Sequence, residues 1–470
     1  MSEERDPNFF SDHNFYDSVN RYEDMLKQQR EFFFDVHEFE EIIDYYIDNR
    51  YFTKAFNAIE TAISQHPGTN LLKLKKANLF IEQGKPQEAL IVLNQQGKVE
   101  PENSDIYILK GLAYLLLRRV RDAIRSYNQA LDMTTEDKVD ILLAINDSIS
   151  NAQETDLQIR YLTQAHQIEP ENLEVIWNLS GCFEQKGDFS KSVSFLDRYL
   201  DIDPFSDHIW YNMGSLYEQL NESEKAIEAY DYTIALNEYY LSAYFGKANA
   251  MSAIDKYTEA IKVYCQILEF DDENEDVFCC IGECYEKMED YKNAYIYYKK
   301  ATEIEEHFPE AWHGLGLVMA YRKQYTKALK YINKAIALDD ENSEFWFALG
   351  NIYNRLKKPE KAMPAFRKTV SLDEHDFEAW LNLADLYAKK NEIGNAIDTL
   401  TESYEFNEKN AFINYRLAAY FFMLGIEEFG LDYLEKGLKL NYVYHKAFLD
   451  AFPEAGNIPV VLNLLKKHKK

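Results

Sequence analysis

Large apolar residues and small residues recur along this chain with a fixed spacing. In the clearest copy, apolar side chains three or four positions apart mark one face of a helix, and a second such segment follows: Trp346, Leu349, Gly350 and Tyr353, then Ala362 and Phe366. The same frame returns every 34 residues along nearly the whole chain. The pattern predicts consecutive pairs of amphipathic helices.

Four prolines give the same period independently of the apolar residues. Pro67 and Pro101 are 34 residues apart, as are Pro170 and Pro204. The 69 residues between Pro101 and Pro170 equal two periods plus one residue, which we place at Lys138. The copies from 36, 70 and 139 match the motif more weakly, with Phe39, Lys73 and Leu142 at the position of the large aromatic, and are placed by this phase alone. The predicted repeats begin at residues 36, 70, 104, 139, 173, 207, 241, 275, 309, 343, 377 and 411.

The frame W-x2-L-G-x2-Y followed by A-x3-F resembles the tetratricopeptide repeat, a helix-turn-helix unit. The resemblance implies an all-α fold, a right-handed superhelical solenoid in which stacked units bury a continuous core. Small residues at the eighth and twentieth positions let the two helices approach closely, and bulky residues fill the space around them. We expect an N-terminal arm and capping helix at 1–35, twelve repeats at 36–444, and C-terminal capping helices with a basic tail at 445–470.

Both ends carry apolar residues that suit the covering of a terminal repeat. Near the N-terminus, one helical face is expected to pack on the first repeat: Tyr16, Val19, Tyr22, Met25 and Leu26. At the other end, a thirteenth unit starts and stops at Pro453, and the residues expected to cover the last interface are Phe448, Ala451, Val460, Val461, Leu464 and Leu465.

The charge of the chain bears on its partners. With 80 acidic and 51 basic residues, the formal net charge is -29. Nucleic-acid binding draws its affinity from a stripe of Lys and Arg, so this class is excluded. We expect a protein or peptide partner, and the acidic charge favours a basic one, although excess acid also serves solubility alone. No apolar run approaches the roughly 18 residues of a membrane helix, and no secretory signal opens the sequence, which favours a cytoplasmic location.

No catalytic or metal-binding motif is present in the sequence. A Gly-rich phosphate loop, a G-x-S-x-G elbow and an H-E-x-x-H pair are all missing, so we predict a protein that is not an enzyme and needs no cofactor. Cys280 and Cys284 lack the further ligands of a zinc site, and the acidic run 271–276 lacks the glycine of a calcium loop. These cysteines are interpreted as small residues of a packed helix, with redox sensing by Cys279 as the alternative.

The resemblance also implies where a ligand would bind. In this family the first helices line a concave groove, and ligands usually meet positions two, five, six, nine, twelve and thirteen of the repeat. Aromatic residues recur at position five and asparagines at positions six and nine. One alternative stays open, in which the rings lean sideways and pack between units. The peptide-binding candidates are Trp177, Asn178, Tyr211, Asn212, Phe245, Asn249, His313, Phe347, Asn351, Asn382 and Tyr415.

Two ligand-binding patterns of this repeat family bear on the kind of partner that we expect. The asparagines look like the asparagine ladder of the repeat arm in O-linked N-acetylglucosamine transferases, where amides bond to a peptide backbone, but Gly246, Cys280, Gly314 and Ala348 interrupt it. Position five holds no lysine in any unit, so the carboxylate clamp of chaperone-tail receptors is missing. We therefore do not expect acidic chaperone C-termini as partners.

The projected lining of the N-terminal repeats is aliphatic instead of aromatic. This patch is expected to need a cover, and its residues are Leu71, Leu74, Ile108, Leu112 and Leu115. One hypothesis is that the segment containing Phe9, Phe10, Phe15 and Tyr16 folds back into it, or inserts into a second copy to form a homodimer. The alternative is that this segment only packs on the first repeat.

The sequence therefore predicts a non-catalytic interaction scaffold that holds an extended or helical protein segment in its concave groove. The alternative is a regulatory or structural subunit of a larger enzyme complex, which would contact its partners through its ends or its convex face.

Overall fold

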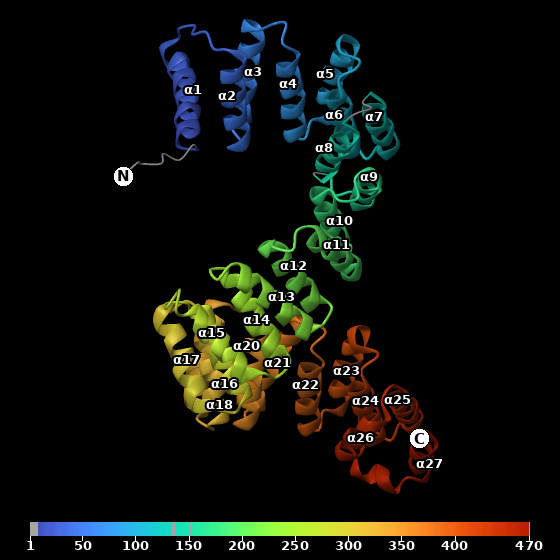
Figure 1. The fold of residues 1–470 in the computed structure, drawn as a ribbon. Helices are drawn as coiled ribbons and strands as arrows, with labels where there is room; N and C mark the ends of the chain where they lie inside the picture. Colours follow the sequence, from blue (N-terminus) through green and yellow to red (C-terminus); the bar gives the residue numbers. More distant parts are fainter. Residues whose placement is uncertain (1–7, 134–136, 151, 470) are drawn as a thin grey trace. The chain divides into compact units, whose positions relative to one another are not determined.

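The computed structural model describes residues 8–133, 137–150 and 152–469, with side chains described from residue 17 onward. Throughout these ranges the secondary structure is helical, and no strand occurs in them (Figure 1). The chain forms two compact units, Met1–Leu236 and Asn237–Lys470, each of which is described by itself. No helix in the described ranges combines the length and the hydropathy that crossing a bilayer requires.

The first unit consists of one long helix followed by six helix pairs. Each pair packs against the next one along the chain. The helices are α1 (Asn8–Gln28), α2 (Val36–Asp48), α3 (Phe52–Gln65), α4 (Asn70–Glu82), α5 (Pro86–Val99), α6 (Ser104–Leu116), α7 (Val120–Met133), α8 (Lys138–Ser150), α9 (Thr155–Ile168), α10 (Leu173–Gln185), α11 (Phe189–Ile202), α12 (Asp207–Gln219) and α13 (Ser223–Leu236).

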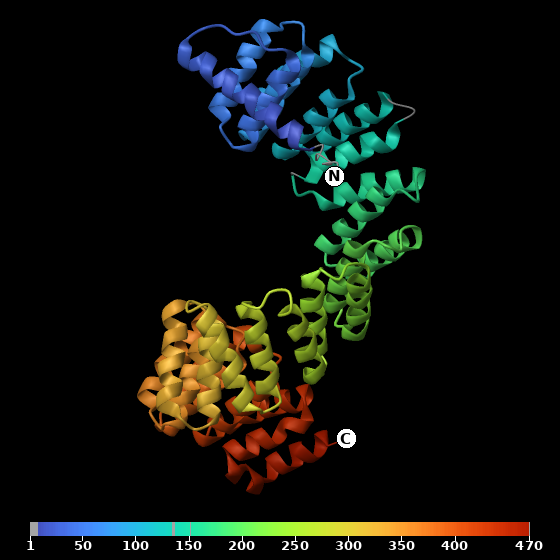
Figure 2. The ribbon, with the colours of Figure 1, turned by 60° about the vertical axis from the view of Figure 1, so that its left-hand side comes forward.

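The second unit consists of six further pairs and a terminal group of short helices. Figure 2 shows these helices, from yellow-green to red, stacked in successive layers. They are α14 (Leu241–Ala253), α15 (Tyr257–Ile267), α16 (Glu275–Lys287), α17 (Tyr291–Ile304), α18 (Pro309–Tyr321), α19 (Tyr325–Leu338), α20 (Ser343–Arg355), α21 (Pro359–Leu372), α22 (Phe377–Lys389), α23 (Ile393–Asn407), α24 (Ala411–Met423), α25 (Glu427–Leu440), η1 (Tyr442–His445), α26 (Lys446–Ala451), η2 (Pro453–Asn457) and α27 (Pro459–His468).

The first helix of every pair begins at the residue that the 34-residue phase predicts, with one exception. That exception is α8, which begins at Lys138, one residue early. The all-α solenoid of twelve helix pairs is confirmed. The division into an arm at 1–35, repeats at 36–444 and caps at 445–470 stays a prediction, because helix bounds alone do not separate domains.

Every pair turns at the same point, the fifteenth residue of the repeat. Its φ angle is positive in all twelve pairs, the left-handed conformation that ends a helix with a characteristic pair of hydrogen bonds. In the turn after α20, for example, the N–H of Lys358 donates to the carbonyl of Tyr353 at 3.0 Å. Only three of the turn residues are glycine: Arg50, Gly84, Arg118, Gln153, Gly187, Asn221, Asp255, Glu289, Lys323, Lys357, Asn391 and Gly425.

We expect Lys357→Gly to raise the free energy of unfolding of the second unit by about 0.5–1 kcal/mol. The left-handed conformation costs a residue with a Cβ about 1–2 kcal/mol, and the greater entropy of an unfolded glycine offsets part of that gain. Urea titration followed by circular dichroism measures the effect. The matched control is Lys361→Gly inside α21, where glycine should cost about 1 kcal/mol. Equal destabilisation by both variants would contradict the explanation.

Close packing explains why small residues occupy the eighth position. The ring of Tyr298 is fully buried, and a Cβ built on Gly282 would lie 2.8 Å from its Cδ1. Gly314, the sixth residue of the next repeat, faces the same ring from the first helix of that pair, and a Cβ there would lie 2.4 Å from Cε1. Contacts this short are repulsive, so both positions need a residue without a side chain. Tyr298 thus joins two consecutive pairs.

Helix α1 covers the first pair through a small aromatic core. Val19, Tyr22 and Met25 are buried as expected, and the Tyr22 ring packs at 5.8 Å from the Phe34 ring centroid. Leu26 is 50% exposed, so its expected role in this cover is wrong. It lies one position past Met25, outside the buried stripe of the helix. The side chain of Tyr16 lies outside the described residues.

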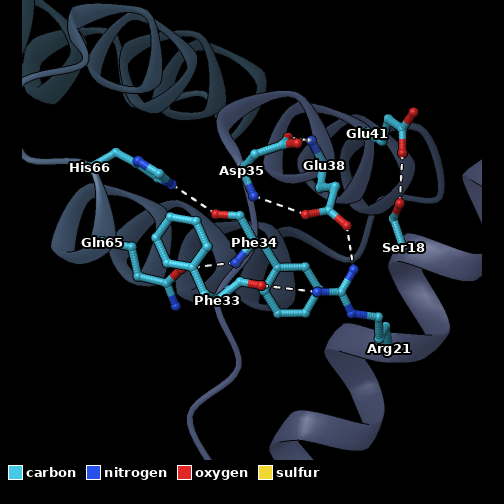
Figure 3. A network of polar contacts seen from close by, with 9 residues as sticks. All are labelled: Ser18, Arg21, Phe33, Phe34, Asp35, Glu38, Glu41, Gln65 and His66. Atoms are coloured by element: carbon cyan, nitrogen blue, oxygen red, sulfur yellow. Dashed lines mark hydrogen bonds and ion pairs between the residues drawn. The ribbon is translucent and has the colours of Figure 1, made fainter.

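A polar network fixes the link between α1 and α2 (Figure 3). Arg21 pairs with Glu38 and also donates to the carbonyl oxygen of Phe33 at 2.9 Å. Glu38 and Asp35 bond to each other's backbone N–H groups in a capping box at the start of α2. The Ser18 hydroxyl donates to Glu41 at 2.8 Å. These bonds orient α1 on the repeat that it covers.

At the C-terminal end, the short helices close the last pair. Phe448, Val461 and Leu465 are buried, as expected, in one cluster with residues of α24 and α25. Ala451 and Leu464 are partly buried and pack against that cluster. Val460 is 54% exposed, so the expectation that it covers the interface is wrong. Its neighbour Val461 takes the inward-facing position.

Candidate functional site

The second unit contains a pocket of about 810 Å³, which we call the inner pocket. Its lining comes mainly from the first helices of consecutive pairs, α16, α18 and α20, and from the start of α22. Most lining residues occupy positions two, five, six, nine, twelve and thirteen. They are Glu286, Lys287, His313, Leu317, Ala320, Tyr321, Lys323, Tyr325, Glu344, Phe347, Ala348, Asn351, Ile352, Arg355, Asp376 and Glu378.

Three of the predicted binding residues meet in this pocket: His313, Phe347 and Asn351. The Phe347 ring also packs edge to face on the core ring of Phe366, with centroids 5.9 Å apart. Phe347 is half-buried, so one face supports the core while part of the ring stays open to the pocket. Phe347 therefore both lines the pocket and packs on a core ring.

His313 forms a neutral polar point of the lining. Burial lowers the pKa of its imidazole to about 4, because the charged form loses its hydration. Its ring lies 4.9 Å from the Phe345 ring, and it makes no hydrogen bond to the residues described here. A neutral imidazole has one donor and one acceptor nitrogen. Both are therefore available to a molecule in the pocket.

Carboxylates gather where the first helices begin and along α16. Glu286, Glu344, Asp376 and Glu378 line the pocket. Glu286 accepts a hydrogen bond from the Tyr298 hydroxyl at 2.9 Å, so a core ring holds this carboxylate in place. None of the four forms an ion pair within the described parts of the chain. Their charges are thus not neutralised by direct salt bridges.

The electrostatic effect of this clustering is clearest at Glu283, one turn before Lys287 on α16. Loss of hydration raises the pKa of Glu283, and the carboxylates of Glu286, Glu344 and Glu310 raise it further, while Lys287 lowers it. The residue is exposed, yet it lies among surrounding protein atoms, as expected for a concave wall. The pKa of Glu286 is also raised, mainly by burial. These carboxylates therefore repel one another.

Basic residues occupy the opposite ends of the same helices. Lys287 and Arg355 close α16 and α20, and Lys323 forms the turn after α18. Acids at helix starts and bases at helix ends also match the helix dipole, which accounts for part of this arrangement. The dipole does not account for Glu283 and Glu286, which lie in the second half of α16.

The cysteines near this site are buried or half-buried. Cys279 is 4% exposed, so the alternative of redox sensing by a partly exposed Cys279 is wrong. Burial raises the pKa of Cys280 to about 12, which leaves its thiol protonated and unreactive at neutral pH. Among the described residues, no three His, Cys, Asp or Glu side chains are placed to hold a metal ion.

In the first unit, the predicted residues of α10 and α12 contact neighbouring rings and the backbone of their own helix. Trp177 is 40% exposed and contacts the His208 ring edge to face, with centroids 6.0 Å apart. Tyr211 packs 5.7 Å from Tyr230. Asn212 donates to the His208 carbonyl of its own helix at 2.7 Å, and Asn178 is half-buried. Their contact with a guest stays a prediction.

The remaining candidates of the second unit differ in access. Phe245 packs edge to face on Tyr264, and Asn249 accepts a hydrogen bond from that tyrosine's hydroxyl. Asn382 is half-buried outside the inner pocket. Tyr415 is fully buried, and its hydroxyl donates to the Asn441 carbonyl at 2.8 Å. The prediction that Tyr415 contacts a peptide is therefore wrong, because the terminal helices close over that position.

The aliphatic groove patch predicted near the N-terminus is wrong. Leu74, Ile108, Leu112 and Leu115 are between 3% and 7% exposed and belong to the core, and Leu71 alone is open, at 44%. Aliphatic side chains at positions five, nine and twelve pack between neighbouring helices here, which leaves no patch to cover. The proposed cover itself, the side chains of Phe9, Phe10, Phe15 and Tyr16, lies outside the described residues.

Several lining residues escaped the sequence analysis. Glu286 occupies position twelve, and Tyr321 and Arg355 occupy position thirteen, all within the set that the resemblance implied. Glu283, at position nine, does not line the pocket, but its pKa is influenced by the carboxylates of Glu286 and Glu344. The search for aromatic rings and amides passed over them. A search for charged residues at the same positions would have found the charged ones.

Models of the tetratricopeptide repeat match residues 74–138, 207–236, 276–308, 309–342, 343–386 and 377–410. No curated protein matches the sequence. Solved structures that are similar include YrrB, titled a TPR protein with an unusual peptide-binding site, at 22% identity over 40% of this chain and 96% of that one, with a TM-score of 0.34.

Two other solved structures cover more of the chain. A tetratricopeptide repeat protein from Parabacteroides merdae shares 17% identity over 53% of this chain and 98% of its own, with a TM-score of 0.46. The Cut9-Hcn1 hetero-tetramer of APC/C contains a chain that shares 14% identity over 92% of this one and 90% of its own, with a TM-score of 0.41. With TM-scores under 0.5, these likenesses carry no argument about function.

Proposed function

The chain belongs to the tetratricopeptide repeat family, and from this premise we propose that it is a non-catalytic scaffold whose inner pocket holds an extended protein segment. The observation that carries the proposal is the meeting of His313, Phe347 and Asn351 on adjacent first helices around one open volume. These residues offer a ring, an amide and an imidazole, which suit an apolar side chain and a peptide backbone.

The size of the pocket supports a guest of a few residues. Its volume of about 810 Å³ lies within the roughly 300–1,000 Å³ of pockets that enclose a drug-sized ligand. The pocket combines apolar residues such as Leu317 and Ile352 with polar side chains at its edges. Such a combination provides contact area in the centre and hydrogen bonds around it.

A second candidate function places the contact on the outer surface of the second unit. Phe429 is 55% exposed and stacks on Phe421, with centroids 5.4 Å apart. Leu424 and Ile426 beside it are also exposed. Such an apolar surface would suit a regulatory or structural subunit that contacts its partners near its C-terminal end.

Selection of random 12-residue peptides on the intact chain, followed by fluorescence anisotropy, tests both candidates. We expect Phe347→Ala and Asn351→Ala each to weaken the selected peptides about tenfold, because a central ring and its neighbouring amide carry much of such an interface. The matched control is Phe429→Ala, which removes an exposed ring of the same unit. Circular dichroism confirms that each variant keeps its fold.

The two candidates give opposite results in this experiment. Loss of binding in Phe429→Ala, together with unchanged binding in Phe347→Ala, would replace the pocket by the outer surface. If none of the peptides selected by the intact chain binds more weakly to Phe347→Ala or Asn351→Ala, the proposal of a segment-binding pocket fails.

A further inference from the structure

Acidic side chains outnumber basic ones in the lining of the inner pocket, where Glu286, Glu344, Asp376 and Glu378 stand against Lys287, Lys323 and Arg355. Glu286 and Glu344 line it from α16 and α20, and Glu283 and Glu310 lie close enough to influence each other electrostatically. Lys287 lowers the pKa of Glu283, and no direct ion pair holds these four carboxylates within the described ranges. Carboxylates on the first helices of three consecutive pairs therefore repel one another electrostatically.

This arrangement disfavours the charged form of the carboxylates at the inner pocket. The pKa values of Glu283 and Glu286 are both raised, by loss of hydration and, at Glu283, by neighbouring carboxylates. Each raised pKa means that the charged form is disfavoured there. A cation placed among the carboxylates would favour the charged form, whereas an anion would add to the repulsion.

His313 points independently to a guest that donates hydrogen bonds. Its imidazole lines the pocket, is half-buried, and has no hydrogen-bond partner among the described residues. Because its pKa lies at about 4, the ring stays neutral at neutral pH and keeps an acceptor nitrogen. The nitrogens of this half-buried ring stay accessible from the pocket, so a donor group there can bond to the acceptor nitrogen.

We propose that the inner pocket takes a cationic side chain, arginine in preference to lysine, from a basic segment of the partner protein. This proposal rests on the proposed function and specifies its chemistry. The guanidinium carries five donors in a plane, which suits a lining that offers the carboxylates of Glu286 and Glu344 and the acceptor nitrogen of His313. It also stacks on aromatic faces, which Phe347, Tyr321 and Tyr325 provide in the lining.

The proposal implies a pH dependence of defined sign. A bound cation favours the charged carboxylates and so lowers the raised pKa values of Glu283 and Glu286. Binding is then tighter above those values and weakens as the pH falls through them. The charged groups that face Glu283 are Glu286, Lys287, Glu344 and Glu310, and their combined field opposes ionisation.

The test uses four degenerate 12-residue peptide pools that carry Arg, Lys, Gln or Glu at a fixed central position. We expect the intact chain to bind the Arg pool about tenfold more tightly than the Gln pool, with the Lys pool between them and the Glu pool weakest. The double variant Glu283→Gln, Glu344→Gln should lower the affinity for the Arg pool about tenfold and leave that for the Gln pool unchanged. Anisotropy titrations measure each pair.

A control variant and the alternative results complete the experiment. Glu259→Gln changes an exposed acid on α15, outside the pocket, and should leave the preference for the Arg pool intact. The pocket variant removes repulsion, so we expect no loss of melting temperature to confuse its result. Equal binding of the Gln and Arg pools, with release by Phe347→Ala, would overturn the cation site and leave the proposed function standing. Binding of no pool, or binding that Phe347→Ala does not affect, would overturn both.

Discussion

Replacement of Tyr298 by alanine is expected to lower the free energy of unfolding of the second unit by about 3–5 kcal/mol. This range is typical for truncation of a buried aromatic ring. The Tyr298 ring is fully buried and fills the space between Gly282 of its own pair and Gly314 of the next one. Its loss leaves a cavity between two pairs that glycine cannot fill. Urea titration followed by circular dichroism measures the loss.

Two further variants separate the ring from its hydroxyl group. Tyr298→Phe keeps the ring and removes the bond to Glu286, so we expect a loss of about 1 kcal/mol and a further rise in the pKa of Glu286. The exposed ring of Tyr239 in the same unit is the control, because Tyr239→Ala should change stability by less than about 0.5 kcal/mol. If Tyr298→Ala costs no more than this control, the coupling of pairs through the ring is wrong.

Tyr22→Ala is expected to destabilise the cover of the first pair by about 3–4 kcal/mol. The ring is fully buried and lies at 6.3 Å from both the Phe39 and the Tyr46 rings. Without it, Arg21 and its partner Glu38 hold α1 mainly through exposed polar bonds, which contribute little. Hydrogen exchange of the α2 and α3 amides should accelerate, and mass spectrometry of peptides from those helices records it.

The same helix supplies the comparison for this prediction. Leu26 is half exposed on α1, so Leu26→Ala should leave the exchange of α2 and α3 almost unchanged. Equal protection of those amides in Tyr22→Ala and in the unchanged protein would show that the aromatic core does not fasten α1.

The positions of the helices could be predicted from the sequence because packing imposes the period. Each pair buries its neighbours' faces, so an added residue shifts the register of every later pair, and the single insertion near Lys138 was visible in the proline spacing. The eighth-position glycines were predictable for the same reason. The gap at Gly314 in the asparagine ladder is now explained, because a side chain there would strike Tyr298.

The binding residues could be predicted only in part. His313, Phe347 and Asn351 do line a pocket, whereas Tyr415 and Leu74 at the same fifth position are buried. The position within a repeat gives the face of the helix on which a side chain lies. Its exposure also depends on the next pair and on the terminal helices, which the period does not specify. The sequence shows that Glu283 and Glu286 are acidic, but it does not show that they lie near other carboxylates. Their electrostatic environment depends on residues from three helix pairs.

Tyr298 has two roles at once, as a spacer between helices and as the hydrogen-bond donor that orients Glu286. Robustness of the fold and recognition of a guest are thereby linked through one side chain. Mutations that improve one property at this position will tend to alter the other, so adaptation of this pocket to new guests should proceed mainly through the rim residues, whose changes leave the stacked pairs intact.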